Sequence, residues 1–133
     1  MLEGSCLCGA VGFAADRLSG PIVHCNCRTC RKAHSAAFAT TARVRRSDFR
    51  WTRGEELLKS YTGHNGTVRR FCSHCGSSMT FAPGGDTGEL VEFALGTLDS
   101  DIELRPDVHI FRDSGAGWYE ITDDLPVFPR GRE

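Results

Sequence analysis

The sequence predicts an all-β fold of several short antiparallel sheets with little helix. Two observations favour this class: the apolar segments are short, and Gly, Pro, Asn or Asp interrupts them. The 15 glycines among 133 residues are spread along the chain as turn residues and form no linker. A chain of this length fits one domain, so we expect residues 1–133 to form a single domain.

The expected strands share a run of apolar or β-branched residues that ends at a turn signal. In chain order they are Ala10 to Ala15, Ile22 to Cys25, Ala37 to Val44, Phe49 to Thr52, Leu57 to Thr62, Thr67 to Phe71, Ser78 to Phe81 and Leu90 to Leu95. Residues 27–34 predict one or two turns of helix. The segments 63–66 and 83–86 predict hairpin loops, and residues 126–133 predict an irregular tail.

All seven cysteines lie in three tight clusters, and this is the most informative feature of the chain. The clusters are Cys6 with Cys8, then Cys25 with Cys27 and Cys30, then Cys72 with Cys75. An odd number of cysteines and the close C-x-C spacing make a disulfide framework the weaker interpretation. The two pairs can close a tetrahedral four-thiolate zinc site, whereas the triplet gives three ligands, the usual number at a catalytic zinc.

The two sites would differ in chemistry. The loop from Cys8 to Cys72 costs roughly 3 to 4 kcal/mol of chain entropy to close, which zinc binding of order 10 kcal/mol can offset. Three thiolates leave less negative charge on zinc than four do, so the triplet zinc would be the better Lewis acid. Arg28, Arg31 and Lys32 lie beside the triplet and could offset its charge or form a solvated surface.

These motifs resemble the glutathione-dependent formaldehyde-activating enzymes, a family that includes centromere protein V. The resemblance covers Gly4 to Gly9, His24 to Lys32 and Phe71 to Gly76. It also covers three downstream segments, Asp107 to Phe111, Trp118 to Glu120 and Asp123 to Pro126. It implies a zinc-bound β-tent fold with two zinc ions per chain. Cys6, Cys8, Cys72 and Cys75 would hold the structural zinc, and Cys25, Cys27 and Cys30 the catalytic zinc.

The resemblance also implies an activity, the joining of glutathione to formaldehyde in S-hydroxymethylglutathione. We therefore expect a zinc-dependent carbon-sulfur lyase-type enzyme with glutathione or another small thiol as co-substrate. In this hypothesis the thiol binds the triplet zinc as a thiolate and attacks, or releases, a carbonyl carbon. The alternative is a zinc-stabilised binding module without catalysis. A methionine sulfoxide reductase B is disfavoured, because it would need two C-x-x-C pairs and a further cysteine.

For several other residues the sequence leaves both a functional role and a structural role open. His34 is the most credible fourth protein ligand of the triplet, although polar packing is its default role. His24 could bond nearby backbone or face a substrate. His109, Phe111, Trp118 and Tyr119 could line a pocket, although packing is the commoner role of such residues. Asp123, Asp124 and Pro126 indicate a turn.

Composition limits the partners and the compartment. With 16 Lys and Arg against 17 Asp and Glu, the formal charge of −1 gives no general attraction to nucleic acid or an anionic membrane. The arginines between residues 43 and 53 fit exposed strand positions more simply than a nucleic-acid surface. No signal sequence or apolar membrane segment is recognisable, so we expect a cytoplasmic protein whose partners are small-molecule thiols and their adducts.

Overall fold

The structure of the protein is a computed structural model, which describes residues 1–131. The chain divides into two compact units. Unit 1 contains Met1–Gly20 and Ala42–Ile102, and unit 2 contains Pro21–Thr41 and the segment from Glu103 onward. That residues 1–133 form a single domain stays a prediction.

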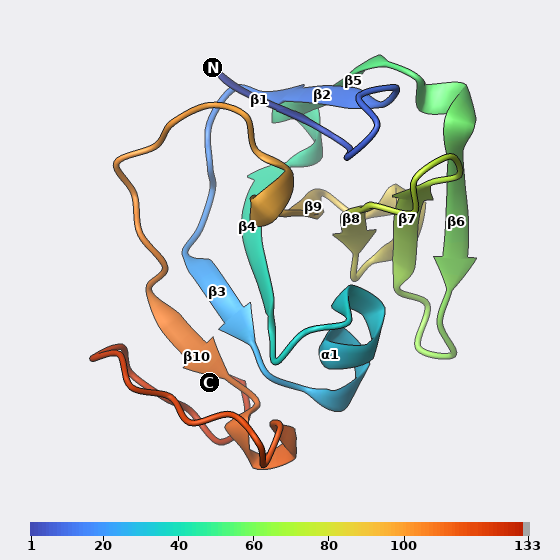
Figure 1. Cartoon of the computed structure of the whole chain (residues 1–133). Coiled ribbons are helices and arrows are strands. Elements are labelled where there is room, and N and C mark those ends of the chain that lie inside the picture. Colours follow the sequence, from blue (N-terminus) through green and yellow to red (C-terminus); the bar gives the residue numbers. More distant parts are fainter. Residues whose placement is uncertain (132–133) are drawn as a thin grey trace. The chain divides into compact units, whose positions relative to one another are not determined.

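Short strands dominate the described residues, and the predicted all-β class is confirmed (Figure 1). The strands are β1 Leu2–Ser5, β2 Gly12–Ala15, β3 Ile22–Cys25, β4 Ala39–Arg45, β5 Phe49–Arg53, β6 Leu58–Thr62, β7 Val68–Cys72, β8 Ser78–Ala82, β9 Leu90–Ala94 and β10 Val108–Ile110. The α-helix is α1 Arg28–His34. Short 3-10 helices cover Arg46–Asp48, Glu55–Leu57, Gly85–Thr87, Leu95–Thr97 and Arg112–Ser114.

Unit 1 contains a three-stranded sheet in the order β1-β2-β5, built around one aromatic cluster. Phe13 of β2 is 1% exposed. Its ring lies 5.3 Å from Phe49 and 5.1 Å from Phe93, measured between centroids. Gly4 of β1 pairs with Phe13, and a Cβ atom at Gly4 would clash with the Phe13 ring. Glycine is therefore required where β1 crosses this ring.

Strands β6, β7, β8 and β9 of unit 1 pair with their sequence neighbours in antiparallel register. Both predicted hairpin loops connect such pairs, residues 63–66 between β6 and β7 and residues 83–86 between β8 and β9. Ser77, which follows the second cysteine pair, returns the chain: its carbonyl accepts from the N–H of Cys72 at 3.0 Å. The β7–β8 turn thus holds Cys72 and Cys75 on one tight segment.

Unit 2 is built on a parallel pair, β3 with β10, which run side by side in Figure 1. His24 pairs with His109 and Cys25 with Ile110. A parallel pair needs a long connection, and here residues 26–107, 82 in all, lie between the end of β3 and the start of β10. The Asp107 carboxylate fixes the start of this pairing by accepting from the N–H of Ile22 at 2.8 Å.

The structure differs from the sequence prediction at β1, β10 and the C-terminal segment. β1 was not expected because Leu2–Ser5 contains glycine and little apolar alternation, and β10 was not expected because it has only three residues. The tail is not irregular throughout. The N–H of His109 donates to Pro126 O and the N–H of Phe128 donates to His109 O, both at 2.9 Å, so the tail pairs with β10. Residues 132 and 133 of the predicted tail lie outside the described residues.

Candidate metal centres

Cys6, Cys8, Cys72 and Cys75 come together in unit 1. Their four sulfurs lie within 4.8 Å of one another. The Cys6 and Cys8 sulfurs are 3.6 Å apart, and those of Cys8 and Cys72 are 3.9 Å apart. The two sequence pairs thus form one cluster, as the spacing predicted.

Two tight turns shape this four-cysteine cluster. Gly9 N–H donates to Cys6 O at 3.0 Å, and Gly76 N–H donates to Cys72 O at 2.8 Å. Both glycines have positive φ, +82° at Gly9 and +80° at Gly76, a conformation that side chains disfavour. Ser77 joins the two turns, because its hydroxyl accepts from the N–H of Leu7 at 2.9 Å.

Hydrogen bonds to sulfur favour the thiolate at two positions of this cluster, Cys6 and Cys75, whereas the pKa of Cys8 is raised to about 11. The backbone N–H of Val11 donates to the Cys6 sulfur at 3.3 Å. The Ser77 hydroxyl lies 3.3 Å from the Cys75 sulfur and lowers the pKa of Cys75 to about 5. Thiolates are the form that binds metal, so these donors prepare the cluster for a cation.

The sulfur separations fit zinc. With zinc-sulfur bonds of about 2.3 Å in a tetrahedron, neighbouring sulfurs lie about 3.8 Å apart. The observed separations of 3.6 and 3.9 Å lie on either side of that value. The cluster therefore fits a four-thiolate zinc site in donor type and in these two separations, and all four sulfurs lie within 4.8 Å of one another.

Cys25, Cys27 and Cys30 form a second cluster in unit 2, with their sulfurs within 4.8 Å of one another. Cys25 ends β3, and Cys27 is the N-cap of α1, whose sulfur accepts from the N–H of Cys30 at 3.3 Å. The predicted helix at 27–34 is thus confirmed as α1, with Cys27 as its cap. The three cysteines are therefore positioned by the end of β3, by the N-cap of α1 and by the first turn of α1.

The triplet sulfurs share protons unequally. Hydrogen bonds from the thiols of Cys25 and Cys30 lower the pKa of Cys27 to about 2. Donating to Cys27 and Cys30 in turn raises the pKa of Cys25. A thiolate therefore forms readily at Cys27. A divalent cation bound by all three sulfurs would replace the thiol protons and stabilise the other two sulfurs as thiolates as well.

His34 does not join the triplet group. Within residues 1–131, the cluster of potential ligands around these sulfurs contains the three cysteines and no histidine or carboxylate. Arg28 and Lys32 are exposed, whereas Arg31 donates from Nη2 to Ser114 O at 3.1 Å. Arg31 is therefore held against the backbone of unit 2, and Arg28 and Lys32 form the solvated part of the basic segment.

A third group, His24, His109 and Asp123, places its ligand atoms within 4.8 Å of one another in unit 2. His109 is fully buried, and its Nε2 lies 2.9 Å from Asp123 Oδ2. That hydrogen bond lowers the pKa of Asp123. His24 bonds Thr40 Oγ1 through Nδ1 at 2.7 Å, and burial lowers the pKa of His24.

Sequence reasoning missed this histidine-carboxylate pair and the asparagine beside it. Asn26, between two triplet cysteines, is fully buried and lies 3.1 Å from His109 Nδ1. The signal was present, because His109 and Asp123 both belong to the downstream segments that resemble the family. Asp123 also accepts from the N–H of Leu125 at 3.1 Å, so the expected turn at this position is confirmed.

The aromatic residues of unit 2 divide between packing and exposure. Phe38 contacts His24, His109 and Tyr119, with centroid distances of 4.4, 5.3 and 5.6 Å. Trp118 is 73% exposed. His109 and Tyr119 therefore have the expected packing role, whereas Trp118 lies at the surface.

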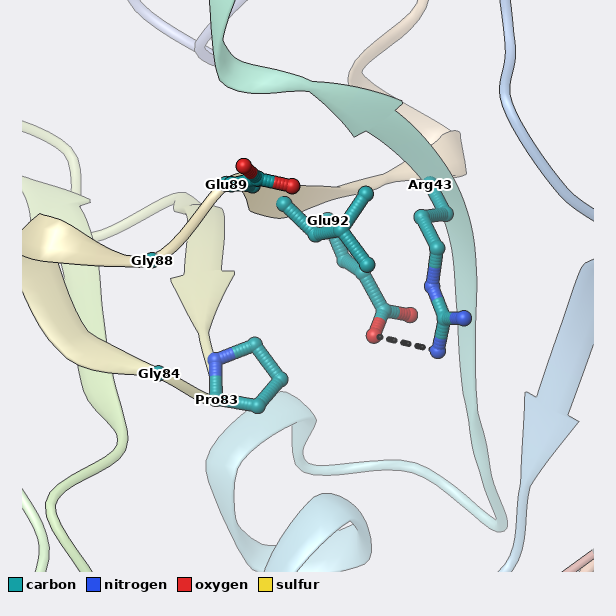
Figure 2. Close-up of a pocket in the computed structure, with 7 residues that line it drawn as sticks. Arg43, Pro83, Gly84, Gly88, Glu89 and Glu92 are labelled. Atoms are coloured by element: carbon teal, nitrogen blue, oxygen red, sulfur yellow. Dashed lines mark ion pairs between the residues drawn. The ribbon is translucent and has the colours of Figure 1, made fainter.

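Unit 1 contains a pocket of about 270 Å³ that none of the cysteines lines. Figure 2 shows the Arg43 and Glu92 side chains facing each other in it, and an ion pair of 3.5 Å joins them. Pro83, Gly84 and Gly88 form much of the remaining wall. Glu89 also lines the pocket, so the lining carries one carboxylate beyond the Arg43–Glu92 ion pair, and it contains no cysteine or other nucleophilic thiol.

The arginines between residues 43 and 53 serve unit 1 itself. Arg46 donates to Gly88 O and Gly85 O, Arg50 pairs with Asp16 at 2.9 Å, and Arg53 donates to Gly9 O. Arg43, Arg45, Arg50 and Arg53 occupy strand positions as predicted, whereas Arg46 begins the 3-10 helix Arg46–Asp48. Within residues 1–131, no helix combines the length and apolarity needed to cross a membrane.

The comparisons with known proteins agree with this geometry. The family model described as "Glutathione-dependent formaldehyde-activating enzyme" matches residues 1–114. A Halomonas elongata protein, provisionally named glutathione-dependent formaldehyde-activating enzyme, is 32% identical over 129 residues, which cover 91% of this chain and 81% of that protein.

A solved structure is also similar. The crystal structure of a Rhodobacter sphaeroides protein is 30% identical, with a TM-score of 0.61, over 76% of this chain and 91% of that chain. The family match spans both cysteine clusters described above and extends over most of the sequence. The chain belongs to the family of glutathione-dependent formaldehyde-activating enzymes.

Proposed function

We propose that the protein is a zinc-dependent carbon-sulfur lyase-type enzyme that acts on adducts of a small thiol such as glutathione. Family membership supports the thiol and aldehyde chemistry. The observation that carries the proposal is the unequal size of the two cysteine clusters, four ligands in unit 1 and three in unit 2. Three protein ligands are typical of a catalytic zinc, and four are typical of a structural one.

In this proposal the chain holds two zinc ions with separate roles. Cys6, Cys8, Cys72 and Cys75 hold the structural ion, and Cys25, Cys27 and Cys30 hold the catalytic ion. When bound, the catalytic zinc supplies Lewis-acid chemistry that makes a neighbouring thiol more acidic. The reaction forms one bond between a thiol sulfur and a carbonyl carbon, and a proton passes from sulfur to the carbonyl oxygen. The reverse reaction breaks that bond, and neither direction needs an oxidant or reductant.

The residues of unit 2 prepare this chemistry. Cys27 supplies a thiolate at neutral pH, and the N–H of Cys30 holds its sulfur in place. Arg28 and Lys32 are exposed next to the triplet, so they are placed to attract an anionic thiol such as glutathione. All seven cysteines, which lie within residues 1–131, are thiols rather than disulfides, which supports a reducing compartment such as the cytoplasm.

The test is adduct formation from glutathione and formaldehyde, measured against the uncatalysed rate. Purified, zinc-loaded protein should accelerate adduct formation, and Cys27→Ser should return the rate to the uncatalysed value while the four-cysteine cluster keeps its zinc. Thr29→Ser, in the same turn of α1, is the matched control and should retain the acceleration. If the unaltered protein gives no acceleration, the proposal fails and a zinc-stabilised binding module becomes the better interpretation.

A further inference from the structure

A buried polar chain leads from Asp123 to the segment that carries the triplet. Asp123 Oδ2 lies 2.9 Å from Nε2 of His109, and Nδ1 of His109 lies 3.1 Å from the side-chain amide nitrogen of Asn26. Asn26 stands between Cys25 and Cys27, and neither Asn26 nor His109 has any exposed surface. Buried polar groups of this kind are costly unless each has its partner.

The contacts of Asn26 fix the orientation of its amide. Its NH2 group faces three acceptors, His109 Nδ1 and the carbonyl oxygens of His24 and Ile110, the latter two at 3.3 and 3.4 Å. Its oxygen faces the Arg112 guanidinium at 3.5 Å. A flipped amide would place oxygen against two carbonyls and NH2 against a guanidinium. The amide nitrogen is therefore the donor to His109.

The orientation of Asn26 in turn fixes the tautomer of His109. Because Nδ1 accepts from Asn26, the proton of the neutral ring must be on Nε2, where it is donated to Asp123. A metal bound at Nε2 would force the proton onto Nδ1, facing the NH2 group of Asn26. The group of His24, His109 and Asp123 is thus better suited to hydrogen bonding than to holding a third metal ion.

The same network connects the triplet to β10. Backbone pairing sets Cys25 opposite Ile110, and the N–H of Asn26 donates to Ile110 O at 2.9 Å. The Asn26 side chain adds its bonds to the same neighbour and to His109. The backbone between the first two triplet cysteines is therefore held from β10 before any metal arrives.

We propose that Asn26 and His109 are positioning residues that hold the segment between Cys25 and Cys27 in the shape needed for metal binding. This inference rests on the proposed function, since it takes the triplet as the zinc site. Without the network, binding would also have to order this segment, and affinity would fall. Residues that orient metal ligands in other proteins typically contribute about 10-fold to 100-fold in metal affinity.

The experiment measures zinc affinity of the triplet in the full chain, by competition with a chromophoric chelator. His109→Phe removes both side-chain hydrogen bonds but retains an aromatic ring beside His24 and Phe38, whose centroids lie 4.7 and 5.3 Å from His109. It should weaken the triplet about 10-fold to 100-fold and leave the four-cysteine cluster unchanged. Asn26→Asp, which replaces the NH2 donor with a second oxygen, should have a similar effect.

Two matched variants separate positioning from general damage. Asp123→Asn retains an oxygen that can accept the Nε2 proton, so it should keep near-normal affinity, whereas Asp123→Ala should not. Val108→Ala truncates a fully buried side chain next to His109 on the same strand, and an aliphatic side chain takes part in none of the hydrogen bonds of the network. It should lower stability while the triplet of the folded protein keeps its affinity.

An independent measurement on the unaltered protein is the nitrogen-15 spectrum of His109. We expect a protonated Nε2 and an unprotonated Nδ1, both with and without zinc. A proton on Nδ1, or equal zinc affinity in the unaltered chain and in His109→Phe, would overturn the inference. If instead the triplet of the unaltered chain binds no zinc, the proposed function itself fails, so the two failures are distinguishable.

Discussion

The two cysteine clusters use the same side chain in opposite ways. In unit 1 the four cysteines come from two turns that are far apart in sequence, with Cys8 and Cys72 in contact across 64 residues. In unit 2 the three cysteines lie within six residues, from the end of β3 into the first turn of α1. One cluster joins distant parts of the chain, and the other is local.

The interactions that hold each cluster in place also differ. The cluster in unit 1 is held by backbone turns at Gly9 and Gly76, with the Ser77 hydroxyl between them. The triplet is held from another strand, because Asn26 within its segment is bonded to His109 of β10. In the proposed function this difference matches two roles: the metal of the four-cysteine cluster would link distant parts of unit 1, and the metal of the triplet would accept a further ligand from outside the protein.

The largest expected effect is on folding. Cys72→Ser removes a ligand that joins distant segments, and structural zinc contributes about 10 kcal/mol or more, comparable with the whole stability of a domain. We expect this variant to be poorly folded and to lose its structural zinc. Cys25→Ser should lose one zinc ion and remain folded. Metal content and circular dichroism of freshly reduced protein check both outcomes, and equal behaviour of the two variants would refute the division of roles.

The second effect is on metal release. A chelator should remove zinc in two phases of one ion per chain, and the triplet should empty first because it supplies three ligands rather than four. Activity should be lost in the first phase, and the folded signal only in the second. Release of both ions in a single phase, with activity and fold lost together, would contradict the separation.

The smallest effects concern single backbone positions in each unit. Gly76→Ala in unit 1 meets no atom within 4 Å but forces a side chain into φ +80°, which costs about 1 kcal/mol. Ser35→Gly in unit 2 relieves φ 53° at the C-cap of α1 and should stabilise by about 0.5 to 1 kcal/mol. Urea unfolding measures the change in the free energy of unfolding of each variant. If both substitutions changed it in the same direction, this account of the turns would be contradicted.

Local patterns predicted most of the fold. β3 has the predicted bounds, and most other strands differ by one or two residues, because short apolar runs ended by Gly or Pro are local signals. The sequence analysis did not predict β1 and β10, because these segments become strands through pairing with their partners and not through a pattern of their own. Leu2–Ser5 is ordered by pairing with β2, and Val108–Ile110 by parallel pairing with β3.

The cysteine spacing predicted both clusters, and the structure brings together the residues of each. The roles assigned to the two clusters stay predictions. Spacing could not reveal the role of Asn26, because its partner His109 is 83 residues away and becomes a neighbour only through the β3–β10 pairing. Nor could it reveal that the segment after Pro126 pairs with β10, since those hydrogen bonds are between backbone groups.

The central claim is that the triplet metal accepts a ligand from outside the protein. Cobalt-substituted protein tests this directly, because the visible spectrum of cobalt reports changes among its ligands. Adding glutathione should change the spectrum of the unaltered protein and of the Thr29→Ser control, and should leave Cys25→Ser unchanged. An unaltered protein with cobalt at both clusters whose spectrum does not respond to glutathione would contradict the account.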